Sequence, residues 1–252
     1  MSLPSYEGQR YQYRVAQDGR RLGQLRTEFR HIKLCKFALQ KILDEYDFES
    51  VVDVGSGAGD HAELFIRHGK KYTGIEFGSV TVERRQRDFQ FRRGRTASKL
   101  IAQAKALVGD FNTMNLTALE GTFDVVWISH VLEHQLDAHT FLRRAISLGK
   151  EGGLIVISVP IFKSQMVGGH VSIWTAGHLL YHLVHAGIDC TNARIGTEGM
   201  ATTVLVPKKS IKRNIRWEYI GGDINRASPY LPRVDGKRLQ EGFHGEISYL
   251  DW

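Results

Sequence analysis

Residues 51–60 read Val51-Val52-Asp53-Val54-Gly55-Ser56-Gly57-Ala58-Gly59-Asp60. The first four are mostly apolar and β-branched, which predicts a short buried strand. Three glycines follow at every second position, and glycine adopts backbone angles that other residues avoid and lets the main chain approach a ligand closely. The spacing differs from the G-x-G-x-x-G of dinucleotide sites and from the phosphate loop. The segment therefore predicts a strand and a tight turn into a helix, and the turn is either a ligand loop or a turn alone.

Strands and helices alternate from this segment onward. The sequence predicts strands at 51–54, 72–76, 106–109, 123–129 and 154–159, and helices at 62–68, 80–93, 141–148 and 176–186. Parallel neighbours need crossover connections, so this alternation predicts a doubly wound α/β sheet. The runs 188–195 and 202–206 follow with only a short connection, which predicts an antiparallel pair. We therefore expect seven strands, mostly parallel, with an antiparallel last strand.

Two further regions flank this predicted domain of residues 48–206. Residues 1–47 form an N-terminal extension or lid, in which apolar residues from Leu25 to Tyr46 recur at helical spacing and predict one helix or two. Residues 207–252 form a tail without strong periodicity.

Composition narrows the class of protein. The chain has 252 residues, a formal charge of +7 and two distant cysteines, which argues against a disulfide scaffold and against a zinc site. It contains neither an apolar run long enough for a membrane span nor an apolar region near its start that would indicate secretion, so we expect a soluble cytoplasmic protein. The positive charge could attract nucleic acid, phosphorylated metabolites or acidic glycans, or could be a solvated surface. Its densest runs are 84–95, with six arginines, 208–216, and the arm around residues 10–21.

Acidic residues follow the predicted strands where a ligand of the glycine loop would lie. Glu76 ends the second strand about 20 residues after the glycines, where a carboxylate can accept hydrogen bonds from ribose hydroxyls. Asp110 and Phe111 follow the third strand, where they could bind an adenine amino group and cover its ring, or form a simple turn with a core aromatic. Asp53 lies in the first strand, and a buried carboxylate needs a partner, so it shapes the loop or meets a cationic ligand.

Together these segments resemble the class I S-adenosylmethionine-dependent methyltransferases. The matching stretches are 53–59, Tyr72-Thr73-Gly74-Ile75-Glu76, Gly109-Asp110-Phe111, 123–134 and 152–160. The fourth of these ends in His130-Val131-Leu132-Glu133-His134, a motif typical of a broad branch that acts on small molecules, quinones and sugars. The resemblance covers roughly Phe48 to Val206 and implies a Rossmann-like fold.

The resemblance also implies a role for each matching residue. Gly55 and Gly57 pass the methionine part of S-adenosylmethionine, Glu76 holds the ribose, and Asp110 and Phe111 border the adenine. Ser129 and His130 line the methionine end, partly through main-chain groups. The remaining cofactor contacts that we expect are Asp53, Ser56 and Phe77. The product would be S-adenosyl-L-homocysteine.

Three groups of histidines could take part in the reaction. His170 follows two glycines after the fifth strand, and a histidine titrates near neutrality, so it is the candidate general base; the alternative is a residue that fixes its loop, with Trp174 in the core. His130, Glu133 and His134 could hold a divalent metal, but capping of the next helix is the favoured interpretation, and we expect no metal site. His178, His182 and His185 are expected on the polar side of an amphipathic helix.

The sequence therefore predicts a methyltransferase that methylates an oxygen of a small polar acceptor, either a saccharide or another glycan or a phosphorylated metabolite. A nucleic-acid methyltransferase, motivated by the arginine runs, is the second hypothesis. A cofactor-binding partner subunit without catalysis is the third.

Overall fold

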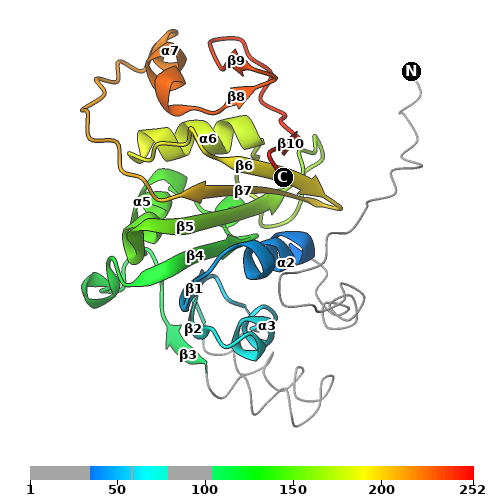
Figure 1. Cartoon of the computed structure of the whole chain (residues 1–252), viewed down its shortest axis with the longest axis vertical. Coiled ribbons are helices and arrows are strands. Elements are labelled where there is room, and N and C mark those ends of the chain that lie inside the picture. The colour runs from blue at the N-terminus through cyan, green and yellow to red at the C-terminus, as the bar shows by residue number, and fades with distance from the viewer. Residues whose placement is uncertain (1–34, 58, 79–103) are drawn as a thin grey trace. The chain divides into compact units, whose positions relative to one another are not determined.

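An eight-stranded sheet forms the centre of the part of the chain that this computed structural model describes, residues 35–57, 59–78 and 104–252 (Figure 1). Its strands are β1 (Ser50–Val54), β2 (Lys71–Glu76), β3 (Lys105–Val108), β4 (Phe123–Ser129), β5 (Gly149–Pro160), β6 (Arg194–Glu198), β7 (Ala201–Pro207) and β10 (Tyr249–Leu250). The spatial order is β10-β6-β7-β5-β4-β1-β2-β3. The pairs from β3 to β5 are parallel, whereas β7 is antiparallel to both of its neighbours. The predicted Rossmann-like α/β class is confirmed.

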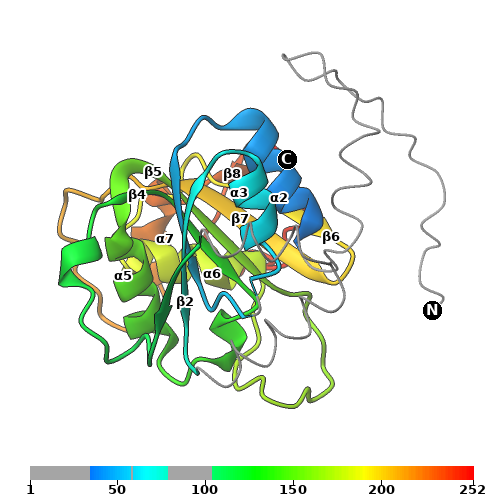
Figure 2. The ribbon, with the colours of Figure 1, turned by 90° about the horizontal axis from the view of Figure 1, so that it is seen from below.

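Helices cover both faces of this sheet. They are α2 (Lys36–Glu45), α3 (Ala62–Arg67), α5 (Ala138–Leu148) and α6 (Ala176–His185), with α7 (Asp223–Ala227) in the tail. Figure 2 shows α2 and α3 on one face and α5 and α6 on the other. The two faces make separate contacts. Val52 and Val54 of β1 lie in the hydrophobic cluster that includes residues of α5 and α6. On the other face, the Phe65 ring of α3 packs on Trp127 of β4. Because water reaches neither face, the inner strands are almost continuously apolar.

Short polar side chains cap the amino ends of α5 and α6, the two helices on one face of the sheet. Asp137 accepts a hydrogen bond from the Thr140 amide at the start of α5, and Thr175 does the same for the His178 amide at the start of α6. These caps satisfy amides that have no partner within the helix. Leu179, as predicted for one side of α6, is fully buried, and the helix packs on the sheet through that side.

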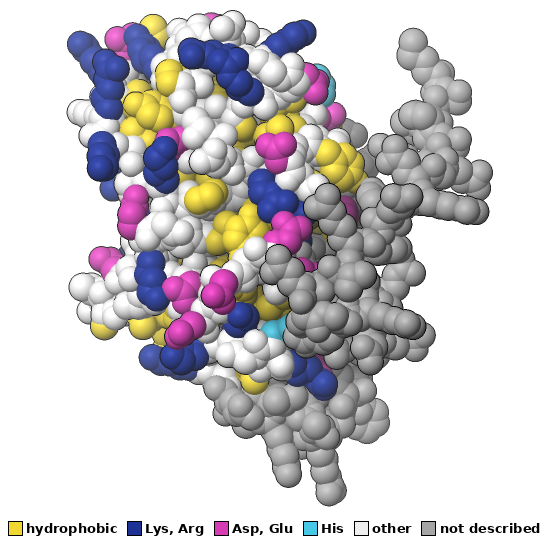
Figure 3. Space-filling model, viewed as in Figure 1, with side chains coloured by type: hydrophobic (Ala, Val, Ile, Leu, Met, Phe, Trp, Pro, Cys, Tyr) yellow, Lys and Arg dark blue, Asp and Glu magenta, His cyan; other side chains and the backbone are white. Residues whose placement is uncertain are grey.

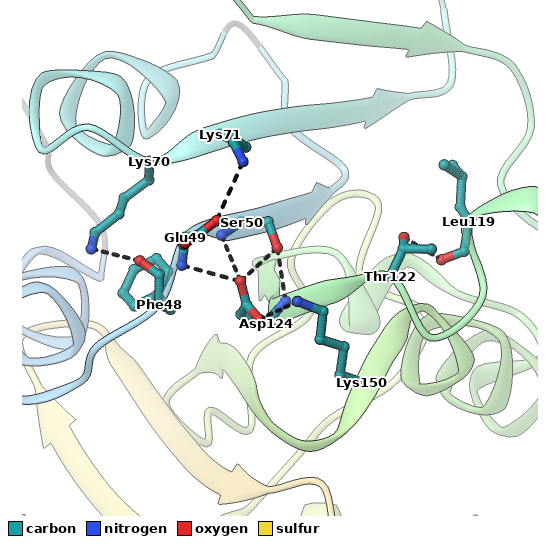
Figure 4. A network of polar contacts seen from close by, with 9 residues as sticks. All are labelled: Phe48, Glu49, Ser50, Lys70, Lys71, Leu119, Thr122, Asp124 and Lys150. Atoms are coloured by element: carbon teal, nitrogen blue, oxygen red, sulfur yellow. Dashed lines mark hydrogen bonds and ion pairs between the residues drawn. The ribbon is translucent and has the colours of Figure 1, made fainter.

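A polar network joins the amino ends of β1 and β4, at the edge opposite the glycines (Figure 4). The Asp124 carboxylate accepts hydrogen bonds from the Ser50 amide and hydroxyl, both at 2.8 Å, and from the Glu49 amide at 3.1 Å. Lys150 of β5 contacts its other oxygen at 2.6 Å. Although burial acts in the opposite direction, these partners hold the pKa of Asp124 well below its usual value. The network therefore fixes three strands at their amino ends.

The tail is more ordered than its sequence indicates. It contains α7, one short 3₁₀ turn at Ser228–Tyr230, the hairpin of β8 (Arg233–Val234) and β9 (Lys237–Arg238), and β10. β10 pairs with β6 and becomes an eighth strand beyond the seven expected. Trp217 stacks on His185 of α6, with ring centroids 3.7 Å apart. The tail thus packs on the sheet edge and on α6.

One predicted strand begins later than expected, and two predicted segments lie wholly or partly outside the described residues. The strand expected at 188–195 begins only at Arg194, because the Asp189 carboxylate accepts hydrogen bonds from the amide and hydroxyl of Thr191 and makes a turn there. The helix expected at 80–93 and the part of the N-terminal extension before Cys35 lie outside the described residues. The domain boundaries after residues 47 and 206 remain predictions.

Candidate functional site

The glycine loop leaves β1 and turns back onto β2. The amides of Gly55 and Ser56 both donate to the Ile75 carbonyl, at 2.8 and 3.1 Å. Gly55 has a φ of 78°, and a β-carbon placed there would lie 2.2 Å from Cγ2 of Val131. Glycine is therefore required at position 55 for two independent reasons, the backbone angle and the side chain of the loop after β4.

Glu76 meets the glycine loop, as the order of the strands predicts. Its Oε2 accepts a hydrogen bond from the Gly57 amide at 2.8 Å. The Gly109 amide donates to the Glu76 carbonyl at 2.9 Å, which brings the end of β3 to the same place. The carboxyl ends of β1 and β3 therefore both contact Glu76, the former at its carboxylate and the latter at its main-chain carbonyl. The neighbouring Phe77 side chain is exposed.

Asp53 has a partner within the protein. It is 1% exposed, and its Oδ2 accepts a hydrogen bond from the Tyr72 hydroxyl at 2.7 Å. Burial and the nearby carboxylate together raise the pKa of Tyr72 well above its usual value, so the phenol keeps the proton that it donates. The Nδ1 atom of His61 lies 3.9 Å away and accepts from the Trp127 indole. These contacts support the interpretation that Asp53 shapes the loop.

Asp110 and Phe111 divide between the surface and the core. The Asp110 carboxylate accepts a hydrogen bond from the Asn112 amide at 2.9 Å and so forms a turn at the end of β3. The Phe111 ring is buried, with its centroid 5.1 Å from that of Phe141, and Arg144 binds its carbonyl at 3.1 Å. The ring faces α5, which favours the core interpretation for this side chain and leaves its adenine contact a prediction.

Ser129 and His130 end β4 beside a residue that sequence reasoning missed. The Ser129 hydroxyl lies 3.1 Å from the thiol of Cys35, which directly precedes α2. Although burial acts in the opposite direction, the neighbouring His130 and His61 lower the pKa of the Cys35 thiol. His130 has a φ of 55°, and its amide donates to the Ser158 carbonyl. No spacing in the sequence connects residue 35 with residue 129.

Electrostatics at His130 favour the imidazolium. Burial alone would lower its pKa, but the Cys35 thiol and the Glu133 carboxylate outweigh burial and raise the pKa to about 9. Its Nδ1 lies 3.4 Å from Oε1 of Glu133. His130, a predicted cofactor-binding residue, therefore contacts the Glu133 carboxylate on the 3₁₀ turn of residues 132–134.

A second cluster contains Glu133, His134 and His170, whose ligand atoms lie within 4.8 Å of one another. The rings of His134 and His170 meet edge to face, with centroids 5.0 Å apart. The sequence predicts that His134 lies near Glu133, but it indicates no contact of either residue with His170. The structure brings all three to the edge of the sheet where β4 and β5 end.

An open depression of about 440 Å³ lies beside this cluster. Leu136, Val171, Ile173, Trp174, His178 and His182 belong to its wall. Trp174 itself is buried, as the alternative interpretation of the His170 loop predicts. Burial, followed by the charges of neighbouring histidines, lowers the pKa of His182 to about 4. The depression therefore combines apolar side chains with the imidazole of His182, which is neutral near pH 7.

Basic side chains are dispersed over the face that Figure 3 draws, with acidic ones among them. Lys209 of the predicted tail cluster pairs with Asp189 at 2.7 Å, and Lys208 donates to the Gly149 carbonyl. The arginine run 84–95 and the N-terminal arm lie outside the described residues. No helix in the described part of the chain is long and apolar enough to cross a membrane.

The chain is similar in sequence to curated methyltransferases. A ubiquinone biosynthesis O-methyltransferase of Colwellia psychrerythraea is 30% identical over 142 residues, which are 53% of this chain and 51% of that protein. The enzyme of the same name from Rhodopseudomonas palustris is 28% identical over 110 residues, 43% of this chain and 38% of that protein. The chain thus spans between about two fifths and one half of the length of these curated relatives.

The fold is shared with solved structures of low sequence identity. An O-methyltransferase family protein from Burkholderia thailandensis gives a TM-score of 0.54 at 14% identity, covering 75% of this chain and 67% of that one. The S-adenosylmethionine-dependent methyltransferase SibL gives 0.53 at 17% identity, covering 69% and 55%. A family model described as a methyltransferase domain matches residues 24–186, more than half of the chain. With this match and the fold, the chain belongs to the methyltransferase-domain family, whose methyl donor is S-adenosylmethionine.

Proposed function

We propose that this protein transfers the methyl group of S-adenosylmethionine to a hydroxyl oxygen of a small polar acceptor. The observation that carries the proposal is the His170 cluster at the carboxyl ends of β4 and β5, next to the converging loops of β1, β2 and β3. In open α/β sheets, ligands bind outside the carboxyl ends of the strands. A donor site and a group that can handle protons therefore share one edge.

The cofactor would lie across the ends of β1 to β4. Gly55 and Gly57 would face its methionine part and Glu76 its ribose, and the Glu76–Gly57 hydrogen bond supports this by presenting the carboxylate at the loop. Asp110 would border the adenine. Ser129 and His130 would line the end nearest the sulfonium. Asp53, Ser56, Phe77 and Phe111 complete the proposed set, with Asp53 and Phe111 acting from the layers beneath the loops.

The reaction would be an in-line displacement. The acceptor oxygen forms a bond to the methyl carbon, the bond from that carbon to sulfur breaks, and S-adenosyl-L-homocysteine leaves with the electron pair. The hydroxyl proton must also depart, and positioned groups can speed this step about 10²- to 10⁴-fold. His170 is the residue that we propose promotes proton removal, because its loop reaches the edge where the methyl group would lie.

Oxygen as the accepting atom is supported by the relatives, which are named ubiquinone biosynthesis O-methyltransferases. A saccharide or phosphorylated metabolite remains the acceptor class that we propose. The depression beside His170 is a suitable place for such a molecule, since imidazoles and the apolar Val171 and Ile173 border it.

Methyl-labelled S-adenosylmethionine tests the proposal. The full chain is incubated with three fractions, namely polar metabolites with glycans, phenolic lipids, and RNA, and the label is followed into each. We expect label in the polar fraction, bound through oxygen. Label in RNA alone would overturn the proposal in favour of a nucleic-acid methyltransferase, and cofactor binding without transfer to any fraction would indicate a non-catalytic partner subunit.

A further inference from the structure

We propose that Glu133, His134 and His170 bind a divalent transition-metal ion that holds the acceptor hydroxyl. This inference rests on the proposed O-methyl transfer and specifies how that site would act. It departs from the expectation of no metal site, because the structure adds His170 to Glu133 and His134. The three ligand atoms lie within 4.8 Å of one another. Ligands around a zinc-sized ion stand about 2.0–2.2 Å from the metal, which side-chain rotations in this cluster can reach.

The Glu133 carboxylate supplies the strongest indication of a missing partner. It is 1% exposed, and among the described residues neither of its oxygens accepts a hydrogen bond. A buried polar group left unsatisfied costs about 1–3 kcal/mol, and more when it is charged. The Nδ1 atom of His130, 3.4 Å from Oε1, offsets part of the charge of Glu133, but Oε2 has no hydrogen-bond partner among the described residues.

His134 is oriented as a metal ligand would be. Its Nδ1 lies 2.7 Å from the Gly169 carbonyl, and since a carbonyl only accepts, Nδ1 must carry the proton. The other ring nitrogen, Nε2, is the atom that could bind an ion, and it lies 3.9 Å from Oε1 of Glu133. Metal-binding histidines commonly fix the second ring nitrogen in this way. Gly169 has a φ of 81°, and a β-carbon there would lie 3.3 Å from Nδ1, so the loop fits closely against the ring.

The backbone holds His170 at this place. The amides of Val171 and Ser172 both donate to the Glu133 carbonyl, at 2.8 and 3.2 Å. The His170 amide closes a turn to the Val167 carbonyl. The loop after β5 is thus bonded directly to the residue that supplies the carboxylate. Main-chain hydrogen bonds therefore hold the loop that carries His170 against Glu133.

The donor set selects the kind of ion. Two imidazoles and one carboxylate suit Zn²⁺, Mn²⁺ or Co²⁺ better than Mg²⁺ or Ca²⁺, which prefer oxygen ligands. Three protein ligands leave a position open for an acceptor oxygen, and the exposed His134 side chain, at 43%, lies on the side that solvent reaches. A hydroxyl bound to the ion would lose its proton more readily. His170 would then promote proton removal as a ligand of the ion.

Metal binding by itself tests the site. Full-length protein without an affinity tag is treated with a chelator, dialysed, and titrated with Zn²⁺ by calorimetry and with Co²⁺ by visible absorption. We expect Glu133→Gln and His134→Gln each to lower the affinity of this site at least tenfold, because each removes one of three ligands. His244→Gln is the matched control, since His244 is an exposed histidine of the tail. Circular dichroism checks that each variant folds. If Glu133→Gln does not fold, His134→Gln still tests the site, because the His134 side chain is exposed.

The outcomes separate this inference from the proposed function. Unchanged Zn²⁺ affinity in both variants, or no Zn²⁺ binding by the wild type, would overturn the metal site. Full methyl transfer in the presence of chelator would also overturn it and leave the methyltransferase proposal intact. Zn²⁺ binding that depends on Glu133 and His134, with no acceptor methylated in any fraction, would support the site and overturn the proposed function.

Discussion

Replacing Gly55 by alanine perturbs the contact between the glycine loop and the loop after β4. Two terms contribute to the expected loss of stability. A non-glycine residue at the observed φ of 78° costs about 1–2 kcal/mol. The new β-carbon would lie 2.2 Å from Cγ2 of Val131, an overlap that something must relieve, and overpacking of this kind typically costs about 1–3 kcal/mol. We therefore expect Gly55→Ala to lower the free energy of unfolding by about 2–5 kcal/mol.

Gly59→Ala is the matched control for the backbone term. Gly59 has nearly the same φ, 79°, but its added β-carbon would meet only the Ala62 side chain at an ordinary 3.5 Å. Its loss should be about 1–2 kcal/mol. Val131→Ala removes the atom that collides, so the double variant Gly55→Ala, Val131→Ala should be more stable than the sum of the two single changes by about 1–3 kcal/mol.

Urea unfolding measures these four free energies, and calorimetric titration with S-adenosyl-L-homocysteine measures the cofactor site in the same samples. We expect Gly55→Ala to weaken binding more than Gly59→Ala, because the collision displaces the loop itself. Equal losses of stability for the two variants, or strict additivity with Val131→Ala, would refute the argument that the Val131 contact requires glycine at position 55.

Three further changes test other parts of the molecule. Glu76→Gln should weaken S-adenosyl-L-homocysteine binding about tenfold or more by calorimetry, since a charge-assisted contact is worth about 1.5–3 kcal/mol, and an unchanged Kd would contradict the proposed ribose site. Asp124→Asn should lower the free energy of unfolding at pH 7 by about 1–2 kcal/mol. Because the folded pKa of Asp124 is depressed, its contribution to stability is fully present above the unfolded pKa, about 3.9. The difference in unfolding free energy between wild type and variant should therefore shrink when urea unfolding is repeated below that pH, and a constant difference would argue against the role of the carboxylate. His182 has a folded pKa of about 4, below its unfolded value of about 6.5, so the unfolded state binds the extra proton between these values and stability should fall as pH drops through this range. The side chain is partly exposed, so about 1 kcal/mol is expected. His182→Gln should flatten that part of the stability profile, and an unchanged profile would contradict this assignment.

The main sheet could be predicted because its strands are buried on both faces. Such strands show as short continuous apolar runs, and the helices between them fix the parallel direction. The strand β10 has only two residues, and its pairing with β6 is a contact with the sheet edge that leaves no periodic pattern in the tail. The late start of β6 has a different cause, the local hydrogen bonds between Asp189 and Thr191, which compete with strand formation.

The candidate site was predictable only where residues follow the strand order. Glu76 and Gly57 end adjacent strands, so their meeting follows from the topology alone. The association of His170 with Glu133 depends instead on two hydrogen bonds between irregular loops, and loop pairing has no sequence period. Cys35 reaches Ser129 through the packing of α2, which lies before the first strand and is not ordered by the sheet.

Val131 connects the two halves of the site in physical terms. Its side chain fills the space that a β-carbon on Gly55 would occupy, and the His134 amide donates to its carbonyl at 3.0 Å. The residue therefore contacts the proposed donor loop through its side chain and the proposed ion ligands through its main chain. Interiors pack too closely for a displaced side chain to be absorbed locally, so a β-carbon at position 55 should shift the segment that carries Glu133. Calorimetric titration of Gly55→Ala should therefore show weaker Zn²⁺ binding as well as weaker cofactor binding, whereas Gly59→Ala should leave Zn²⁺ binding unchanged.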